Sequence, residues 1–139
     1  MTVSVNGVVI ADASVSAEMQ YHPAADLIEA RRHAVEALVV REVLRQAVQK
    51  VGLAEGPEAF DALLSGIAVV EPSVKECRAY FDAHRERFPL PVFELVEADI
   101  AAHLGEMAWR NGVRRFIRAL VDEAAIVGVR FAPAVGATP

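Results

Sequence analysis

Apolar residues recur along most of the chain at steps of three and four, the spacing that places them on one face of an α-helix. The longest such pattern runs from about Val92 to Ala124 and changes side near Asn111-Gly112. The two stripes are Phe93, Val96, Ile100, Leu104 and Met107, then Trp109, Val113, Phe116, Leu120 and Ala124. We therefore expect one long helix whose two halves pack against different partners.

A second long helix is predicted between Asp26 and about Val51. Asp26 is a good N-cap residue, Glu29 follows it at capping-box spacing, and Gly52 supplies a C-terminal cap. The apolar face of this helix also drifts. Its expected core residues are Leu27, Ala30, Ala34 and Leu38 in the first half, and Val40, Val43, Leu44, Ala47, Val48 and Val51 in the second.

Three shorter helices are expected from capping residues and prolines. They start at one of Asp12, Ser14 or Ser16, at Pro57, and at Ser73 with Glu76 as its capping-box partner, the last running to about Arg87.

Residues 3–10 read as a β-hairpin, because Asn6-Gly7 lies between β-branched residues. Two strands alone are marginally stable in water, so a third is needed, and residues 126–131 are the best candidate. The predicted fold class is mostly α, with about five helices, two of them long, and a small antiparallel sheet that joins the two ends of the chain. We expect a single domain over residues 1–131 and a disordered tail over residues 132–139.

Composition narrows the possible partners and location. Fourteen Lys and Arg residues against 19 Asp and Glu residues give a net charge of −5, and the basic residues are spread out, so no nucleic-acid partner is expected. No apolar run is long enough to cross a membrane, and the start lacks the pattern of a secretory signal. We therefore predict a cytoplasmic protein with no membrane partner. Cys77, the sole cysteine, is predicted to be buried.

The sequence nominates no catalytic residue, no metal ligands and no cofactor. The four histidines form no pair at ligand spacing on one helix, and the sequence has neither a nucleophile elbow nor a phosphate-binding glycine loop. Arg110, Arg114 and Arg118 share one helical face, with Arg115 beside it. This face is either solvated or in contact with an acidic partner.

Five segments stand in a characteristic order. They are Val5-Asn6-Gly7-Val8-x-Ile10 with Glu18-Met19; Ala37 to Leu44; Pro72-Ser73-Val74-x-Glu76-Cys77-x-x-Tyr80-Phe81-x-x-His84-x-x-x-Phe88; Phe93-Glu94-x-Val96 through Phe116-Ile117-Arg118; and Ile126-x-Gly128-Val129. Together they resemble the helical chaperone domain of the SurA-type, parvulin-associated peptidyl-prolyl isomerases. The domain shares its fold with the trigger factor C-terminal domain, and the nearest likeness is to the nitrogen-fixation accessory isomerase NifM and its cytoplasmic relatives.

The chain departs from that family at residues 88–92. There the family carries a parvulin domain of on the order of a hundred residues, comparable to a small domain. This chain has only Pro89, Leu90, Pro91 and Val92 between the segments that match. None of the parvulin catalytic residues has a counterpart, so the resemblance does not extend to isomerase activity, and we expect no enzyme.

The resemblance implies a non-catalytic domain that holds unfolded or nascent client segments in an apolar groove. Flexible methionine and aromatic side chains suit such binding. The predicted groove residues are Met19, Tyr21, Phe93, Met107 and Trp109. Three alternatives stay open: a structural module that forms a helix-exchanged homodimer, a prolyl isomerase with an unrecognised site, and an accessory factor in the maturation of a nitrogenase-type metalloenzyme.

Overall fold

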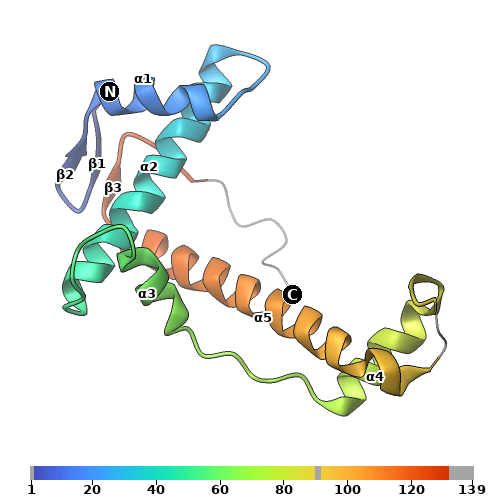
Figure 1. Cartoon of the computed structure of the whole chain (residues 1–139). Coiled ribbons are helices and arrows are strands. Elements are labelled where there is room, and N and C mark those ends of the chain that lie inside the picture. The colour runs from blue at the N-terminus through green and yellow to red at the C-terminus, as the bar shows by residue number, and fades with distance from the viewer. Residues whose placement is uncertain (1, 90–91, 132–139) are drawn as a thin grey trace. The chain divides into compact units, whose positions relative to one another are not determined.

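The structure is a computed structural model that describes residues 2–89 and 92–131 (Figure 1). Within these residues it is mostly helical with one small sheet, which confirms the predicted fold class. The elements are β1 Val3–Val5, β2 Val8–Ile10, α1 Asp12–Glu18, the 3-10 turn η1 Met19–Tyr21, α2 Leu27–Lys50, α3 Ala59–Ser65, α4 Val74–Ala83, the 3-10 turn η2 Arg85–Arg87, α5 Phe93–Glu123 and β3 Ile126–Val127.

The chain divides into two compact units, and α5 contributes residues to both. Unit 1 is built from Met1–Ser65 and Phe116–Pro139, and unit 2 from Gly66–Arg115. The single domain over residues 1–131 stays a prediction. The predicted tail over 132–139, and Leu90 and Pro91 within the predicted insertion point at 88–92, lie outside the described residues.

The sheet of unit 1 has the strand order β2-β1-β3 and is antiparallel throughout. Asn6 and Gly7 form the hairpin turn with φ of 51° and 85°, the two positive values that a type I′ turn requires. β3 pairs with β1 through Ser4 and Val127, so the two ends of the chain meet in one sheet as predicted. β3 is shorter than predicted and is followed by Gly128, whose φ is 90°.

Helix α2 is capped at both ends by the predicted residues. The Asp26 carboxylate accepts a hydrogen bond from the Glu29 amide at 2.8 Å. At the other end the Gly52 amide donates to the Gln49 carbonyl and the Leu53 amide to the Val48 carbonyl, both at 3.1 Å. This pair of bonds is the Schellman arrangement, with Gly52 at the left-handed position.

The core of unit 1 lies where α2 contacts β1, α1 and η1, with the last turns of α5 packed against it. Its buried residues are Val3, Val5, Val15, Ala34, Val35, Val39, Val43 and Val121. Unit 2 has a core of its own, made by Cys77, Phe81, Phe93 and Ile100. The two halves of α5 therefore pack in different cores, as predicted. The change falls after Arg115 and not at Asn111-Gly112, so Trp109 and Val113 of the second predicted stripe belong to unit 2.

Candidate functional site

Helix α4 starts at a full capping box. The Ser73 hydroxyl accepts from the Glu76 amide at 3.1 Å, and the Ser73 amide donates to the Glu76 carboxylate at 3.3 Å. The predicted end at Arg87 is wrong, because α4 ends at Ala83. Residues Arg85–Arg87 form the separate 3-10 turn η2. The capping box determines where the helix begins and therefore which residues share a face with Cys77.

Helix α5 is held against α4 by aromatic packing. The Phe93 ring is 4% exposed and meets the Phe81 ring edge-on, with ring centroids 5.6 Å apart. The Arg78 guanidinium lies 4.4 Å from the centroid of the Phe93 ring, at cation–π distance. Phe88 packs on Phe81 at 5.3 Å. These contacts position the first turns of α5 beside α4.

An open groove with a volume of about 330 Å³ lies between the two helices, inside unit 2. It is lined by Pro72, Val74 and Cys77 from the α4 side, and by Glu94, Glu97, Ala98 and Ala101 from α5. The four α5 residues stand at i, i+3, i+4 and i+7, on one helical face. Because Ala98 and Ala101 have short side chains, the space beside α4 stays unfilled.

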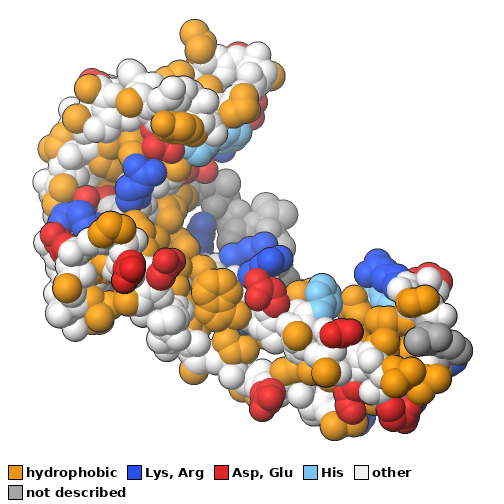
Figure 2. Space-filling model, viewed as in Figure 1, with side chains coloured by type: hydrophobic (Ala, Val, Ile, Leu, Met, Phe, Trp, Pro, Cys, Tyr) orange, Lys and Arg blue, Asp and Glu red, His pale blue; other side chains and the backbone are white. Residues whose placement is uncertain are grey.

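The groove has an apolar floor and a carboxylate wall. Cys77 is 2% exposed, whereas Val74 is 66% exposed, so the floor is buried at Cys77 and exposed to solvent at Val74. Val70 and Leu95 are also strongly exposed, at 88% and 65%, but neither of them lines the groove. In Figure 2, hydrophobic side chains reach the surface over the α4 end of unit 2, with acidic side chains among them. A surface of this kind can bury one or two apolar side chains of a ligand.

The five predicted groove residues are divided between the two units. Met19 packs against the core of unit 1, and Tyr21 in η1 is 70% exposed. Phe93, Met107 and Trp109 belong to unit 2, where Met107 is 44% exposed and Trp109 is half-buried. Phe93 is a core residue, because its ring is enclosed by Phe81 and Arg78, so it cannot serve as an open groove wall.

Sequence reasoning missed the residues that do line the groove. The available signal was the spacing of Glu94, Glu97, Ala98 and Ala101, a helical face that combines small and acidic side chains. That signal is ambiguous, because small residues on a helix equally permit close packing. Only the position of α4 shows that space is left.

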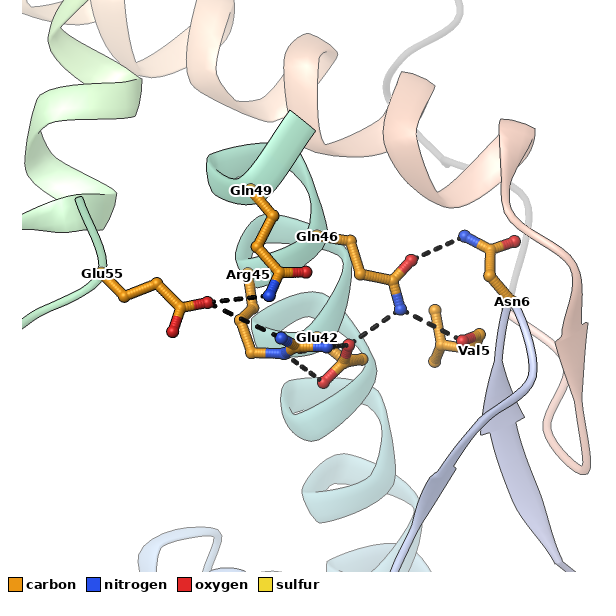
Figure 3. A network of polar contacts seen from close by, with 7 residues as sticks. All are labelled: Val5, Asn6, Glu42, Arg45, Gln46, Gln49 and Glu55. Atoms are coloured by element: carbon orange, nitrogen blue, oxygen red, sulfur yellow. Dashed lines mark hydrogen bonds and ion pairs between the residues drawn. The ribbon is translucent and has the colours of Figure 1, made fainter. Parts of the chain in front are cut away.

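A polar network ties α2 to the hairpin of unit 1 (Figure 3). The Glu42 carboxylate accepts from Arg45 Nη2 at 2.6 Å and from Gln46 Nε2 at 2.8 Å. Gln46 Nε2 also donates to the Val5 carbonyl at 3.1 Å, and Asn6 Nδ2 donates to Gln46 Oε1 at 2.8 Å. Every member has a partner within unit 1, which indicates a structural role.

Two carboxylates of unit 1 have a lowered pKa. For Glu42 the main cause is its hydrogen bonds from Arg45, and burial opposes the shift. For Glu18 the main cause is the 2.8 Å contact with His22 Nε2, with Arg41 adding to it. Both carboxylates therefore stay ionised to lower pH than usual, and neither is poised to donate or accept a proton near neutrality.

The arginine series on α5 is largely matched by acceptors on the same helix. Arg110 pairs with Glu106 at 3.2 Å, Arg118 pairs with Asp122 at 3.1 Å, and Arg114 donates to the Asn111 side chain at 3.3 Å. These i,i+3 and i,i+4 contacts indicate that the arginine face of α5 is a solvated face and not a docking surface for an acidic partner.

Across residues 2–89 and 92–131, no cluster of three or more His, Cys, Asp or Glu side chains has the arrangement of a metal site. Nor does any helix in this part of the chain combine the length and apolar character needed to cross a bilayer.

The chain was compared with protein-family models, curated proteins and solved structures, and none of the three comparisons found a match.

Proposed function

We propose that this chain is a non-catalytic, chaperone-like domain that binds extended or partly folded client segments in the groove between α4 and α5. The observation that carries the proposal is the groove itself: an open, partly apolar surface between α4 and α5 whose lining includes the strongly exposed Val74. Exposed apolar surface of this kind in a folded chain commonly marks an interaction site.

The proposed chemistry is burial without covalent steps. One or two client side chains entering the groove contribute roughly 1.5–3 kcal/mol each, and much of this is offset by ordering the client. The expected affinity is therefore weak, with a Kd on the order of millimolar or weaker for a single short segment. Weak, broad binding suits the transient holding of many clients. The resemblance to SurA-type chaperones and NifM relatives supports this function and a cytoplasmic location.

The test fills the groove and measures client holding. Ala98→Phe places a ring in the groove, while Ala102→Phe makes the same change at an exposed position of α5 that does not line it. We expect the native chain and Ala102→Phe to suppress aggregation of an unfolded client at stoichiometric ratio, and Ala98→Phe to lose most of this activity. Equal suppression by the two variants, or none by the native chain, would reject the proposal.

A second candidate function is homodimerisation through unit 1. It is favoured by Leu27 and Ile28 at the start of α2, which are 78% and 83% exposed although large and apolar. Sedimentation measurements of the native chain and of Ile28→Lys decide it. A dimer that dissociates in Ile28→Lys supports the interface, and a native chain that sediments as a monomer excludes it.

A further inference from the structure

The wall of the groove carries two carboxylates, and neither forms an ion pair with another of the described residues. Glu94 and Glu97 both line the groove, less than one helical turn apart at the start of α5. Among the described residues neither side chain has a hydrogen-bond or ion-pair partner. Some acids elsewhere in the chain do pair with an arginine, as Glu18, Glu42 and Glu106 show.

Charge and apolar surface thus coexist at one site. The positive end of the α5 dipole favours Glu94 in the first turn, so the helix tolerates the charge without an internal partner. Two like charges this close repel each other and disfavour an anionic ligand. A lysine or arginine fits both features, because its aliphatic stem can lie on the apolar floor while its head group reaches the carboxylates.

We propose that the groove selects client segments in which an aliphatic residue is adjacent to lysine or arginine. The aliphatic side chain occupies the floor formed by Val74, Cys77 and Ala98, and the cation lies against Glu94 and Glu97. This inference rests on the proposed function and specifies its ligand. The net charge of −5 acts in the same direction at long range, by attracting basic segments.

The expected preference is modest and depends on salt. Ion pairs at a solvent-exposed rim are weak and screened, so two of them favour a basic segment over a neutral one by about three- to tenfold. Specificity of this size enriches basic-apolar segments, which occur widely in unfolded chains, without restricting binding to one partner.

The experiment uses three peptides with the same aliphatic centre, flanked by lysine, glutamine or glutamate. Each is titrated into isotope-labelled protein, and binding is followed by the methyl signals of Val74, Ala98 and Ala101. We expect the lysine peptide to bind about three- to tenfold more tightly than the glutamine peptide, and the glutamate peptide to bind most weakly. Raising the ionic strength from about 0.02 M to about 0.5 M should remove most of the difference.

Two double variants separate local from global charge. Glu94→Gln with Glu97→Gln should abolish the preference for lysine, so that the lysine and glutamine peptides bind this variant with equal affinity. Glu106→Gln with Glu123→Gln removes the same charge from α5 at positions outside the groove, and should keep the preference.

The outcomes distinguish the two proposals. Equal groove binding by all three peptides overturns the charge preference and leaves the proposed function standing. Equal loss of the preference in both double variants overturns the assignment to Glu94 and Glu97, because it reflects net charge alone. Absence of methyl shifts with every peptide overturns the proposed function and the inference with it.

Discussion

Asn6 shows how one side chain can serve several elements. It adopts the positive φ of the hairpin turn, and its side-chain nitrogen, Nδ2, donates to the Gln46 side chain on α2. Its side-chain oxygen accepts a hydrogen bond from the Ala125 backbone amide, and its backbone amide donates to the Ala125 carbonyl, both at 2.8 Å. The same residue therefore forms the turn and attaches the segment before β3 to it.

The contribution of the Asn6 side chain is measured by Asn6→Gly. Glycine keeps the positive φ but loses both side-chain hydrogen bonds, so we expect a loss of about 1–3 kcal/mol in the free energy of unfolding. Gln49→Ala is the control, since it removes an exposed side-chain bond to Glu55 within unit 1. Chemical denaturation would contradict this role if the two variants lost the same stability.

Glycine is required at position 128 for a steric reason that does not apply at position 7. Both have positive φ, but a Cβ at Gly128 would lie 2.3 Å from the Thr2 carbonyl oxygen, whereas a Cβ at Gly7 meets nothing within 4 Å. We expect Gly7→Ala to cost about 1–2 kcal/mol from the backbone conformation alone, and Gly128→Ala to cost clearly more. Similar melting temperatures for the two variants would show that the segment after β3 moves away without cost.

At the scale of elements, the ends of the helices follow local chemistry where a cap is well placed. Asp26, Gly52 and Ser73 act at the ends for which they were predicted. Helix α1 differs: it begins at Asp12 after Ala11, without a side-chain cap, so Asp12, Ser14 and Ser16 are not its N-caps. Helix α3 begins at Ala59, two residues beyond Pro57. Both helices have seven residues, and so short a helix depends on its tertiary contacts.

Two glycines inside α5 have different structural roles. Gly105 has open space where a Cβ would lie, whereas a Cβ at Gly112 would lie 3.1 Å from the Ile67 Cγ2 methyl group in unit 2. Alanine is favoured over glycine by about 1 kcal/mol in a helix interior. Gly105→Ala should therefore raise the melting temperature, and Gly112→Ala should gain less or lose stability. Equal gains in melting temperature for both variants would show that the packing of Ile67 does not require a glycine at position 112.

For the whole molecule, the two cores explain why α5 changes face. Ile100 is buried in unit 2 and Val121 in unit 1, and they belong to separate clusters. The hydrophobic pattern predicted this division but placed some residues wrongly. Leu27 and Val51, predicted on the core face of α2, are 78% and 61% exposed. Leu27 is the first residue of α2, and Val51 follows its last residue, Lys50.

The stability of unit 1 should depend on pH through Glu18 and Glu42. The pKa of each is lowered in the folded chain from the ordinary value of 4.5, so the unfolded chain binds more protons as the solution is acidified. The stabilisation is fully present above about pH 4.5 and is lost as the pH falls through the lower folded pKa.

Chemical denaturation between about pH 7 and about pH 3 checks this dependence. Glu42→Gln should be less stable near neutrality and should show a smaller loss on acidification than the native chain, because one of the two linked groups is gone. Glu123→Gln, at an exposed position, should follow the native profile. A Glu42→Gln profile parallel to the native one would contradict a role for this carboxylate.

The sequence by itself determined the elements whose causes are local: the Asn6-Gly7 turn, the Asp26 and Ser73 caps, the Gly52 end and the two apolar stripes of α5. Each depends on residues a few positions apart, so their spacing carries the information. Only the tertiary structure decided which side chains face open space. Phe93 is enclosed because α4 brings Phe81 and Arg78 to it, and Ala98 lines a groove because its short side chain faces α4 without filling the gap. The burial of a side chain and the space left beside it depend on contacts between segments that are distant in sequence. The periodicity of apolar residues along one helix therefore cannot predict them.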